Sequence, residues 1–100
     1  MKHRISEQGL KRQKLLCQRI IQIRLEQKRT RVDVAVGADL NPNYYGKIER
    51  GKTGSIGMRT LDKIRKSLGI KWKEFGSDYE FLSFLDGSDE DNEEEYYNQR

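Results

Sequence analysis

Lysine and arginine are the residues whose number and distribution point to chemistry in this chain, and that chemistry is the binding of a polyanion. Residues 1–85 contain 19 Lys and Arg against 9 Asp and Glu, a net charge of +10. Residues 86–100 contain one Arg against 7 Asp and Glu, a net charge of −6, so the overall +4 conceals a basic body and an acidic tail. A basic body favours a polyanionic partner, although many solvated helix faces are equally rich in Lys and Arg.

Catalysis and metal binding are poorly supported by the residue types. No nucleophile and base stand at a spacing that indicates a catalytic pair, and the carboxylates are concentrated in a tail that cannot hold a fixed geometry. One Cys and one His exclude an internal disulfide and a Cys/His zinc site. We therefore expect a protein that is not an enzyme, with no catalytic residues, no metal and no cofactor.

Two segments show the apolar spacing of amphipathic helices, as expected for a small all-α domain. The first, residues 10–27, has a core-facing stripe of Leu16, Ile20 and Ile23. It also has a second stripe that needs another cover, formed by Cys17, Ile21 and Leu25. The second segment, residues 58–68, ends before a C-capping Gly69 and has a stripe of Met58, Leu61, Ile64 and Leu68.

Between these segments, residues 31–50 are typical of two short helices joined by a tight turn. Thr30 and Asn41 are suitable N-caps for the two helices. Pro42 then occupies the first helical position of the second helix, where its missing N–H costs nothing.

This stretch resembles the helix-turn-helix of the phage repressor/Cro-like DNA-binding family. The family has a small residue at the fifth position of the motif, which is Ala35 here. Its apolar positions are matched by Val34, Ala38, Leu40, Tyr45 and Ile48. Residues 48–51 are Ile-Glu-Arg-Gly, a frequent end of the family's second helix. Asp39 departs from the family's usual Gly at a turn position that requires positive φ, which Asp tolerates better than most residues.

The resemblance covers roughly residues 16–75 and implies a five-helix repressor-like bundle, closed by a short fifth helix over residues 70–75 that contributes Trp72 and Phe75 to the core. We expect four parts along the chain. They are a flexible basic arm (1–9), the helix-turn-helix domain (10–76), a C-terminal helix for cover or dimerisation (77–85) and a disordered acidic tail (86–100). The C-terminal helix is expected to be capped by Ser77 or Asp78 and to cover the second stripe, within the subunit or across a dimer.

The resemblance also implies the site, position by position. The base-facing positions are Asn41, Pro42, Asn43 and Lys47. Among them, Asn43 suits the edge of an adenine and Lys47 the O6 and N7 atoms of a guanine. The candidate phosphate contacts are Arg31, Tyr44, Arg50 and Lys52. An ion pair between Arg24 and Glu49 is expected to clamp the first helix to the DNA-reading helix.

The function expected from the resemblance is sequence-specific binding to double-stranded DNA by a transcriptional regulator, with a repressor favoured, acting as a homodimer. The sequence has no apolar stretch long enough to cross a bilayer and no signal-peptide segment, so a cytoplasmic protein without membrane contact is expected. The alternatives are an antitoxin, a restriction–modification controller, or a protein-bridging module with little DNA specificity. The acidic tail could bind a protein partner, compete with DNA for the basic face, or serve solubility alone.

Overall fold

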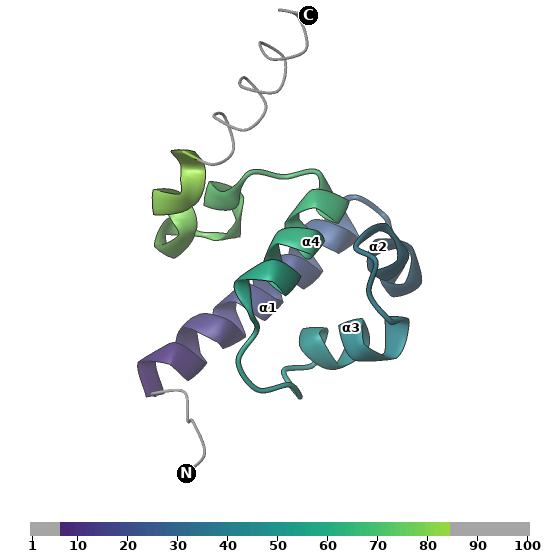
Figure 1. Ribbon diagram of the computed structural model, residues 1–100, viewed down its shortest axis with the longest axis horizontal. Coiled ribbons are helices and arrows are strands. Elements are labelled where there is room, and N and C mark those ends of the chain that lie inside the picture. The colour runs from purple at the N-terminus through teal and green to yellow at the C-terminus, as the bar shows by residue number, and fades with distance from the viewer. Residues whose placement is uncertain (1–6, 85–100) are drawn as a thin grey trace, which may run out of the picture. The chain divides into compact units, whose positions relative to one another are not determined.

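The computed structural model describes residues 7–84, which contain four α-helices, two 3-10 helices and no strand (Figure 1). In chain order these are α1 (Glu7–Glu26), α2 (Arg31–Gly37), α3 (Pro42–Glu49), α4 (Met58–Leu68), η1 (Trp72–Phe75) and η2 (Ser77–Leu82). The all-α class is confirmed. The predictions made for residues 1–6 and for the acidic tail lie outside the described residues, and α1 begins three residues before its predicted start.

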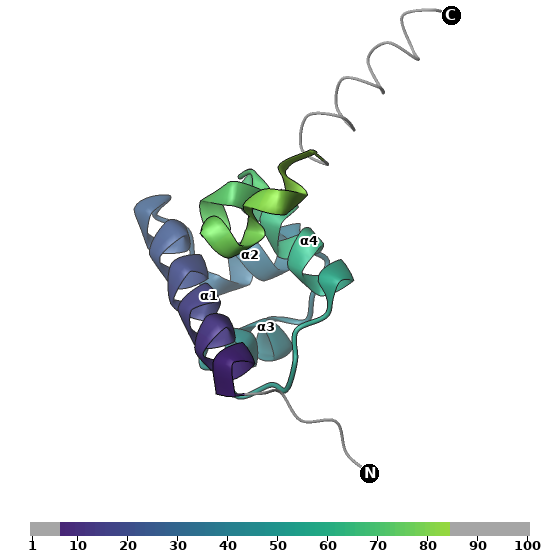
Figure 2. The same cartoon turned by 90° about the vertical axis from the view of Figure 1, so that its left-hand side faces the viewer.

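The contacts divide the chain into two compact units, with the boundary between Gly69 and Ile70. In the first unit, α3 lies between α1 and α4 in the view of Figure 2. All four α-helices contribute buried side chains to this unit, among them Ile20, Ile23, Val34, Ala35, Tyr45, Ile48, Leu61 and Ile64. The core is therefore formed mainly by the apolar stripes that the helical spacing predicts.

Two residues of the predicted stripes are exposed, Met58 and Leu25. Met58 is 52% exposed, which corrects its expected place in the core, because it is the first residue of α4. The second stripe of α1 is divided, since Cys17 is buried whereas Leu25 is 60% exposed. The cover proposed for this stripe from residues 77–85 stays a prediction.

The first three helices end in the same way, with one residue in the left-handed region. The residues are Lys28 (φ 58°), Asp39 (φ 56°) and Gly51 (φ 68°). After each of them, the next backbone N–H bonds back to the helix, in the pairs Arg29 to Arg24, Leu40 to Ala35 and Lys52 to Lys47. This is the Schellman arrangement, which satisfies carbonyls at a helix end. Asp39 thus adopts the positive φ that the tight turn requires.

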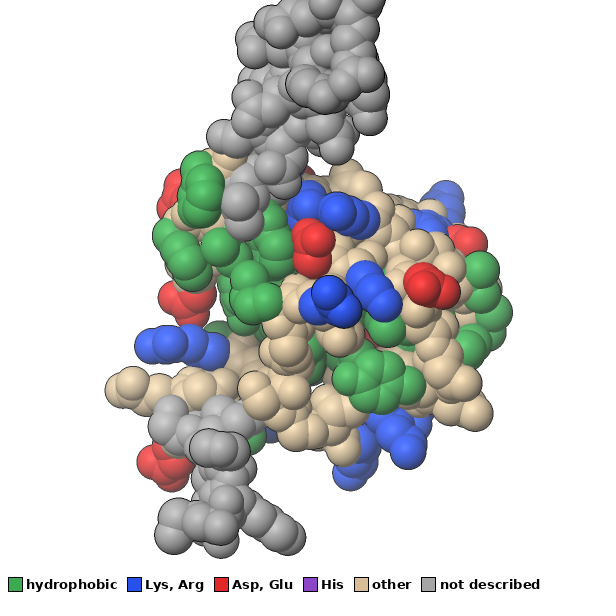
Figure 3. All heavy atoms as spheres, in the orientation of Figure 1, with side chains coloured by type: hydrophobic (Ala, Val, Ile, Leu, Met, Phe, Trp, Pro, Cys, Tyr) green, Lys and Arg blue, Asp and Glu red, His purple; other side chains and the backbone are tan. Residues whose placement is uncertain are grey.

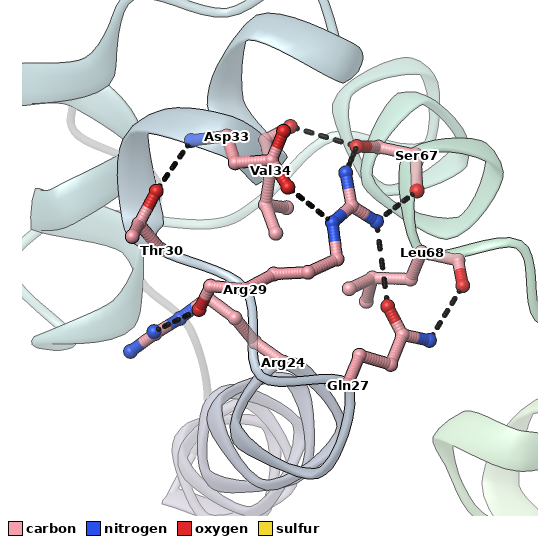
Figure 4. A network of polar contacts seen from close by, with 8 residues as sticks. All are labelled: Arg24, Gln27, Arg29, Thr30, Asp33, Val34, Ser67 and Leu68. Atoms are coloured by element: carbon pink, nitrogen blue, oxygen red, sulfur yellow. Dashed lines mark hydrogen bonds and ion pairs between the residues drawn. The ribbon is translucent and has the colours of Figure 1, made fainter.

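A polar network fixes α2 against the C-terminal end of α4 (Figure 4). The Arg29 guanidinium donates to the backbone carbonyl of Ser67, and the Ser67 hydroxyl donates to the carbonyl of Val34 at 2.8 Å. The Gln27 side-chain amide donates to the carbonyl of Leu68 at 2.7 Å. Because these bonds join the α1–α2 connection to both α2 and α4, they limit how far α2 can rotate.

The second unit, as far as it is described, consists of η1 and η2. The predicted fifth helix is a 3-10 helix, in which the rings of Trp72 and Phe75 meet edge to face with centroids 6.0 Å apart. Phe75 makes a similar contact with Tyr79 of η2. The residue that precedes η2 is Gly76, at φ 138°, and η2 has no side-chain cap, so the expected cap by Ser77 or Asp78 was wrong.

Candidate nucleic-acid interface

The helix α3 buries one face and leaves the other open to solvent. Tyr45, Ile48 and Glu49 are buried. The predicted base-facing and phosphate-facing residues on and beside α3 are all exposed, namely Asn41, Pro42, Asn43, Tyr44, Lys47, Arg50 and Lys52. Because Asn43 and Lys47 are four residues apart, they project from one exposed face. Figure 3 shows Lys and Arg side chains gathered along the lower edge of the molecule, beneath α3.

The N-terminal end of α3 is held by its cap. The Asn41 side-chain oxygen accepts the backbone N–H of Asn43 at 2.8 Å and that of Tyr44 at 3.2 Å. Its carbonyl is therefore engaged, and the side-chain NH₂ is the part that can donate to another molecule. Pro42 follows at the first helical position, as predicted. This capped end presents the backbone of α3 in one fixed orientation to whatever binds the exposed face.

Glu49 lies beneath that face and holds α3 to α1. The Arg24 guanidinium donates to both of its carboxylate oxygens, from Nε at 2.7 Å and from Nη2 at 3.1 Å. The two side chains are 8% and 2% exposed. The expected ion pair is therefore present, and it is bidentate and buried. Arg24 also donates to the carbonyl of Arg29, which extends the clamp to the start of α2.

The ionisation of this pair follows from its contacts. Burial alone raises the pKa of Glu49. The hydrogen bond from Arg24, with smaller contributions from Tyr45, from the charge of Arg24 and from Arg31, outweighs burial and leaves that pKa below its ordinary value. The same hydrogen bond raises the pKa of Arg24 above its ordinary value. Glu49 and Arg24 are therefore both charged in the folded protein at neutral pH.

Arg31, a predicted phosphate contact, also binds Glu49, and this contact was not predicted from the sequence. It is the first residue of α2, and its Nε donates to Glu49 Oε1 at 3.2 Å. Its side chain remains 58% exposed, so much of the guanidinium stays accessible to a phosphate. One carboxylate thus binds α1, α2 and α3 together at the point where the interface begins.

Two further buried groups surround Glu49. Burial first, and then the negative charge of Glu49, raise the pKa of the Cys17 thiol, which therefore stays protonated and poorly nucleophilic. The Tyr45 hydroxyl is also buried, close to Glu49 and Arg24, and burial holds its pKa above the ordinary value. Cys17 and Tyr45 are therefore both part of the buried core.

Two further contacts lie beside the exposed face of α3. A Cβ on Gly46 would lie 3.1 Å from Nη1 of Arg50, so the Arg50 side chain folds back over the helix that carries it. From α1, Gln13 bonds to Gly54 and Ile56 in the connection between α3 and α4. Since Gln13 is more than 40 residues away from these partners, no spacing rule could have identified it.

The comparisons with known proteins agree with this geometry. A family model described as helix-turn-helix (HTH_3, the Cro/C1 type) matches residues 20–75. No curated protein and no solved structure matched the chain. Among residues 7–84, no helix is long and apolar enough to cross a membrane. Because the model matches more than half of the sequence, this chain belongs to the Cro/C1-type helix-turn-helix family of DNA-binding proteins.

Proposed function

We propose that the protein is a transcriptional regulator that binds specific sequences of double-stranded DNA and reads the major groove with α3. The observation that carries this proposal is the exposed face of α3, on which Asn43 and Lys47 lie one turn apart. The opposite, buried face of α3 is held to α1 by the ion pair of Glu49 with Arg24. In helix-turn-helix proteins the second helix of the motif lies in the major groove with its N-terminal residues at the base edges.

The exposed residues divide into two groups by chemistry. Asn43 can make two hydrogen bonds to an adenine, and Lys47 can donate to guanine O6 and N7. Asn41 can add a donor and Pro42 an apolar contact with a thymine methyl. The remaining polar residues suit phosphates, which position the protein without specifying sequence. These are Arg31, Tyr44, Arg50 and Lys52.

A homodimer is part of the proposal. One helix-turn-helix reads only a few base pairs, and specific binding commonly uses two copies on half-sites about 34 Å apart. The exposed aromatic residues Phe81 and Phe84 of the second unit, at 72% and 62% exposure, are the candidate contacts between copies, together with Leu25 of α1. Repression is the simplest output, because occupying an operator is enough to exclude other proteins from it.

Selection of bound duplexes from a random pool, using the full chain, tests the proposal. The expected result is an enriched motif with two-fold symmetry and half-sites about one helical turn apart. Lys47→Ala should relax the preference at one base pair of each half-site, by about 1–3 kcal/mol. Lys66→Ala, which removes the same charge from α4, is the matched control and should preserve the motif. A pool without any enriched motif would exclude sequence-specific binding.

A protein-bridging role is the second candidate, and one observation favours it. Val32 and Val36 stand four residues apart on α2 and are 56% and 66% exposed. Apolar side chains are visible over α2 at the right-hand edge of Figure 3. Such a face suits a protein partner. If the chain is an antitoxin, that partner would be the toxin that it neutralises. Duplex binding that does not discriminate between sequences would favour this candidate over the first.

A further inference from the structure

One side chain of α1 holds the connection between α3 and α4. The Gln13 Nε2 donates to the carbonyl of Gly54 at 2.8 Å, and its Oε1 accepts the backbone N–H of Ile56 at 3.1 Å. Both ends of the amide are thus engaged, on either side of Ser55 along the chain. In Figures 1 and 2, this connection runs near the N-terminal half of α1.

The part of α1 that provides this contact lies outside the family match. α1 begins at Glu7, whereas the matched region begins at residue 20. Gln13 therefore lies outside the part of the chain that the family model matches. A groove of about 510 Å³ separates this part of α1 from the end of α3, and both Lys14 and Arg50 line it. Positive charge is thus present where the connection leaves the exposed face of α3.

The glycines of the connection give an independent indication. Gly54 and Gly57 have no positive φ, and a Cβ on either would meet no heavy atom within 4 Å. Neither backbone conformation nor packing within the described chain therefore requires glycine at these positions. A glycine is useful where another molecule must approach the backbone closely. Next to the proposed major-groove helix, the DNA backbone is the molecule with suitable chemistry.

We propose that Gln13 is a positioning residue for DNA, which fixes residues 51–57 so that their backbone and Lys52 meet a phosphate. This inference rests on the proposed function. A connection with three glycines has high conformational entropy, and ordering it on DNA would reduce affinity. The two hydrogen bonds of Gln13 order it in the free protein. The contact adds affinity on every sequence, because a phosphate carries no base information.

The test compares Gln13→Met with Gln18→Met in the full chain. Methionine keeps the length and helix preference of glutamine but cannot form either hydrogen bond. Gln18 lines the same groove and has no hydrogen bond to the described residues, which makes it the matched control. Q13M should weaken binding to the selected operator and to unrelated duplexes alike, by about three- to tenfold. Q18M should bind as the unchanged protein does.

Two readouts distinguish positioning from general destabilisation. The slope of log affinity against log salt should fall in Q13M, because one phosphate contact is lost, and the preferred motif should not change. The double variant Q13M/K52A should lose less than the product of the two single losses, since both remove the same contact. A Q13M protein with unchanged affinity and salt slope would overturn the inference while leaving the proposed function intact. An unchanged protein that binds no duplex would overturn both.

If Q13M does not fold, Gly54→Ala tests whether the backbone of residues 51–57 meets a phosphate. This substitution leaves Gln13 in place and meets no neighbouring atom, so the melting temperature should hold. Affinity for all duplexes should nevertheless fall several-fold, because the added Cβ obstructs the approach of the phosphate. Full affinity in G54A would then overturn the inference.

Discussion

Glu49 joins three helices through one carboxylate, so its replacement should affect the whole domain. In Glu49→Gln, Arg24 keeps its charge in a buried position without a compensating partner. Removing one member of a buried pair typically costs about 3–5 kcal/mol. We expect a loss near this size in the free energy of unfolding, measured by chemical denaturation at pH 7. Asp62→Asn, which removes a carboxylate paired at the surface of α4, should cost less than about 1 kcal/mol.

The same carboxylate predicts a dependence on pH. The pKa of Glu49 is lower in the folded chain than its ordinary 4.5, so the unfolded chain binds more protons between the two values. Stability from this group is therefore complete above pH 4.5 and is lost as the pH falls through the folded pKa. The difference in unfolding free energy between the unchanged protein and E49Q should shrink over that window. A difference that stays constant from pH 7 to pH 3 would contradict this assignment.

Asp39 carries a local cost that glycine would relieve. It is exposed and adopts φ 56° at the end of α2, a conformation that costs a residue with a Cβ about 1 kcal/mol. Asp39→Gly should therefore raise the free energy of unfolding by about 0.5–1 kcal/mol, and Asp39→Ala should lower it. Lys28→Gly offers a parallel case at the end of α1, with φ 58°. A destabilising D39G would mean that the Asp39 side chain stabilises the turn.

At the scale of elements, the contact between α2 and α4 depends on the absence of a side chain. A Cβ on Gly37 would lie 2.5 Å from the Ser67 hydroxyl oxygen, which itself bonds to α2. Gly37→Ala should therefore reduce stability by about 1–3 kcal/mol through overpacking, despite its better helix propensity. In a Ser67→Ala background the same substitution should be neutral or stabilising. Thermal melting of the four proteins in this cycle measures the coupling, and additive effects would contradict the predicted clash.

The elements that were predicted correctly are those with local signals. The caps at Thr30 and Asn41 and the apolar spacing of the helices depend on residues within a few positions of one another, so the sequence contains them directly. The spacing of residues 70–85 could not separate an α-helix from the observed 3-10 helices, because these are too short to show a period.

Only part of the candidate interface could be predicted from the sequence. Exposure of Asn43 and Lys47 follows from the burial of Tyr45 and Ile48, since the two sets occupy opposite faces of one helix. The sharing of Glu49 by a second arginine could not be predicted, because it depends on the angle between α2 and α3. Tertiary packing sets that angle, and no spacing along the chain encodes it.

At the scale of the whole molecule, the uneven charge of the chain predicts how its ends affect binding. Removing residues 86–100 takes away seven carboxylates and one arginine, which raises the net charge from +4 to +10. A more positive protein attracts any duplex more strongly at low salt. We therefore expect the shortened chain to bind unrelated duplexes more tightly than the full chain at about 50 mM salt, measured by fluorescence anisotropy. The gain should fade near 1 M salt, where the screening length is about 3 Å.

A matched variant separates charge from chain length in that experiment. Replacing the seven carboxylates of residues 86–100 by their amides preserves the length of the tail but removes its negative charge. If charge alone acts, the amide variant and the shortened chain should gain affinity equally, and the selected base motif should be the same in both. A gain confined to the shortened chain would mean that the tail blocks the interface by its bulk. Equal affinity in all three proteins at low salt would contradict the prediction, because it would mean that the charge of −6 in residues 86–100 does not act on duplex binding.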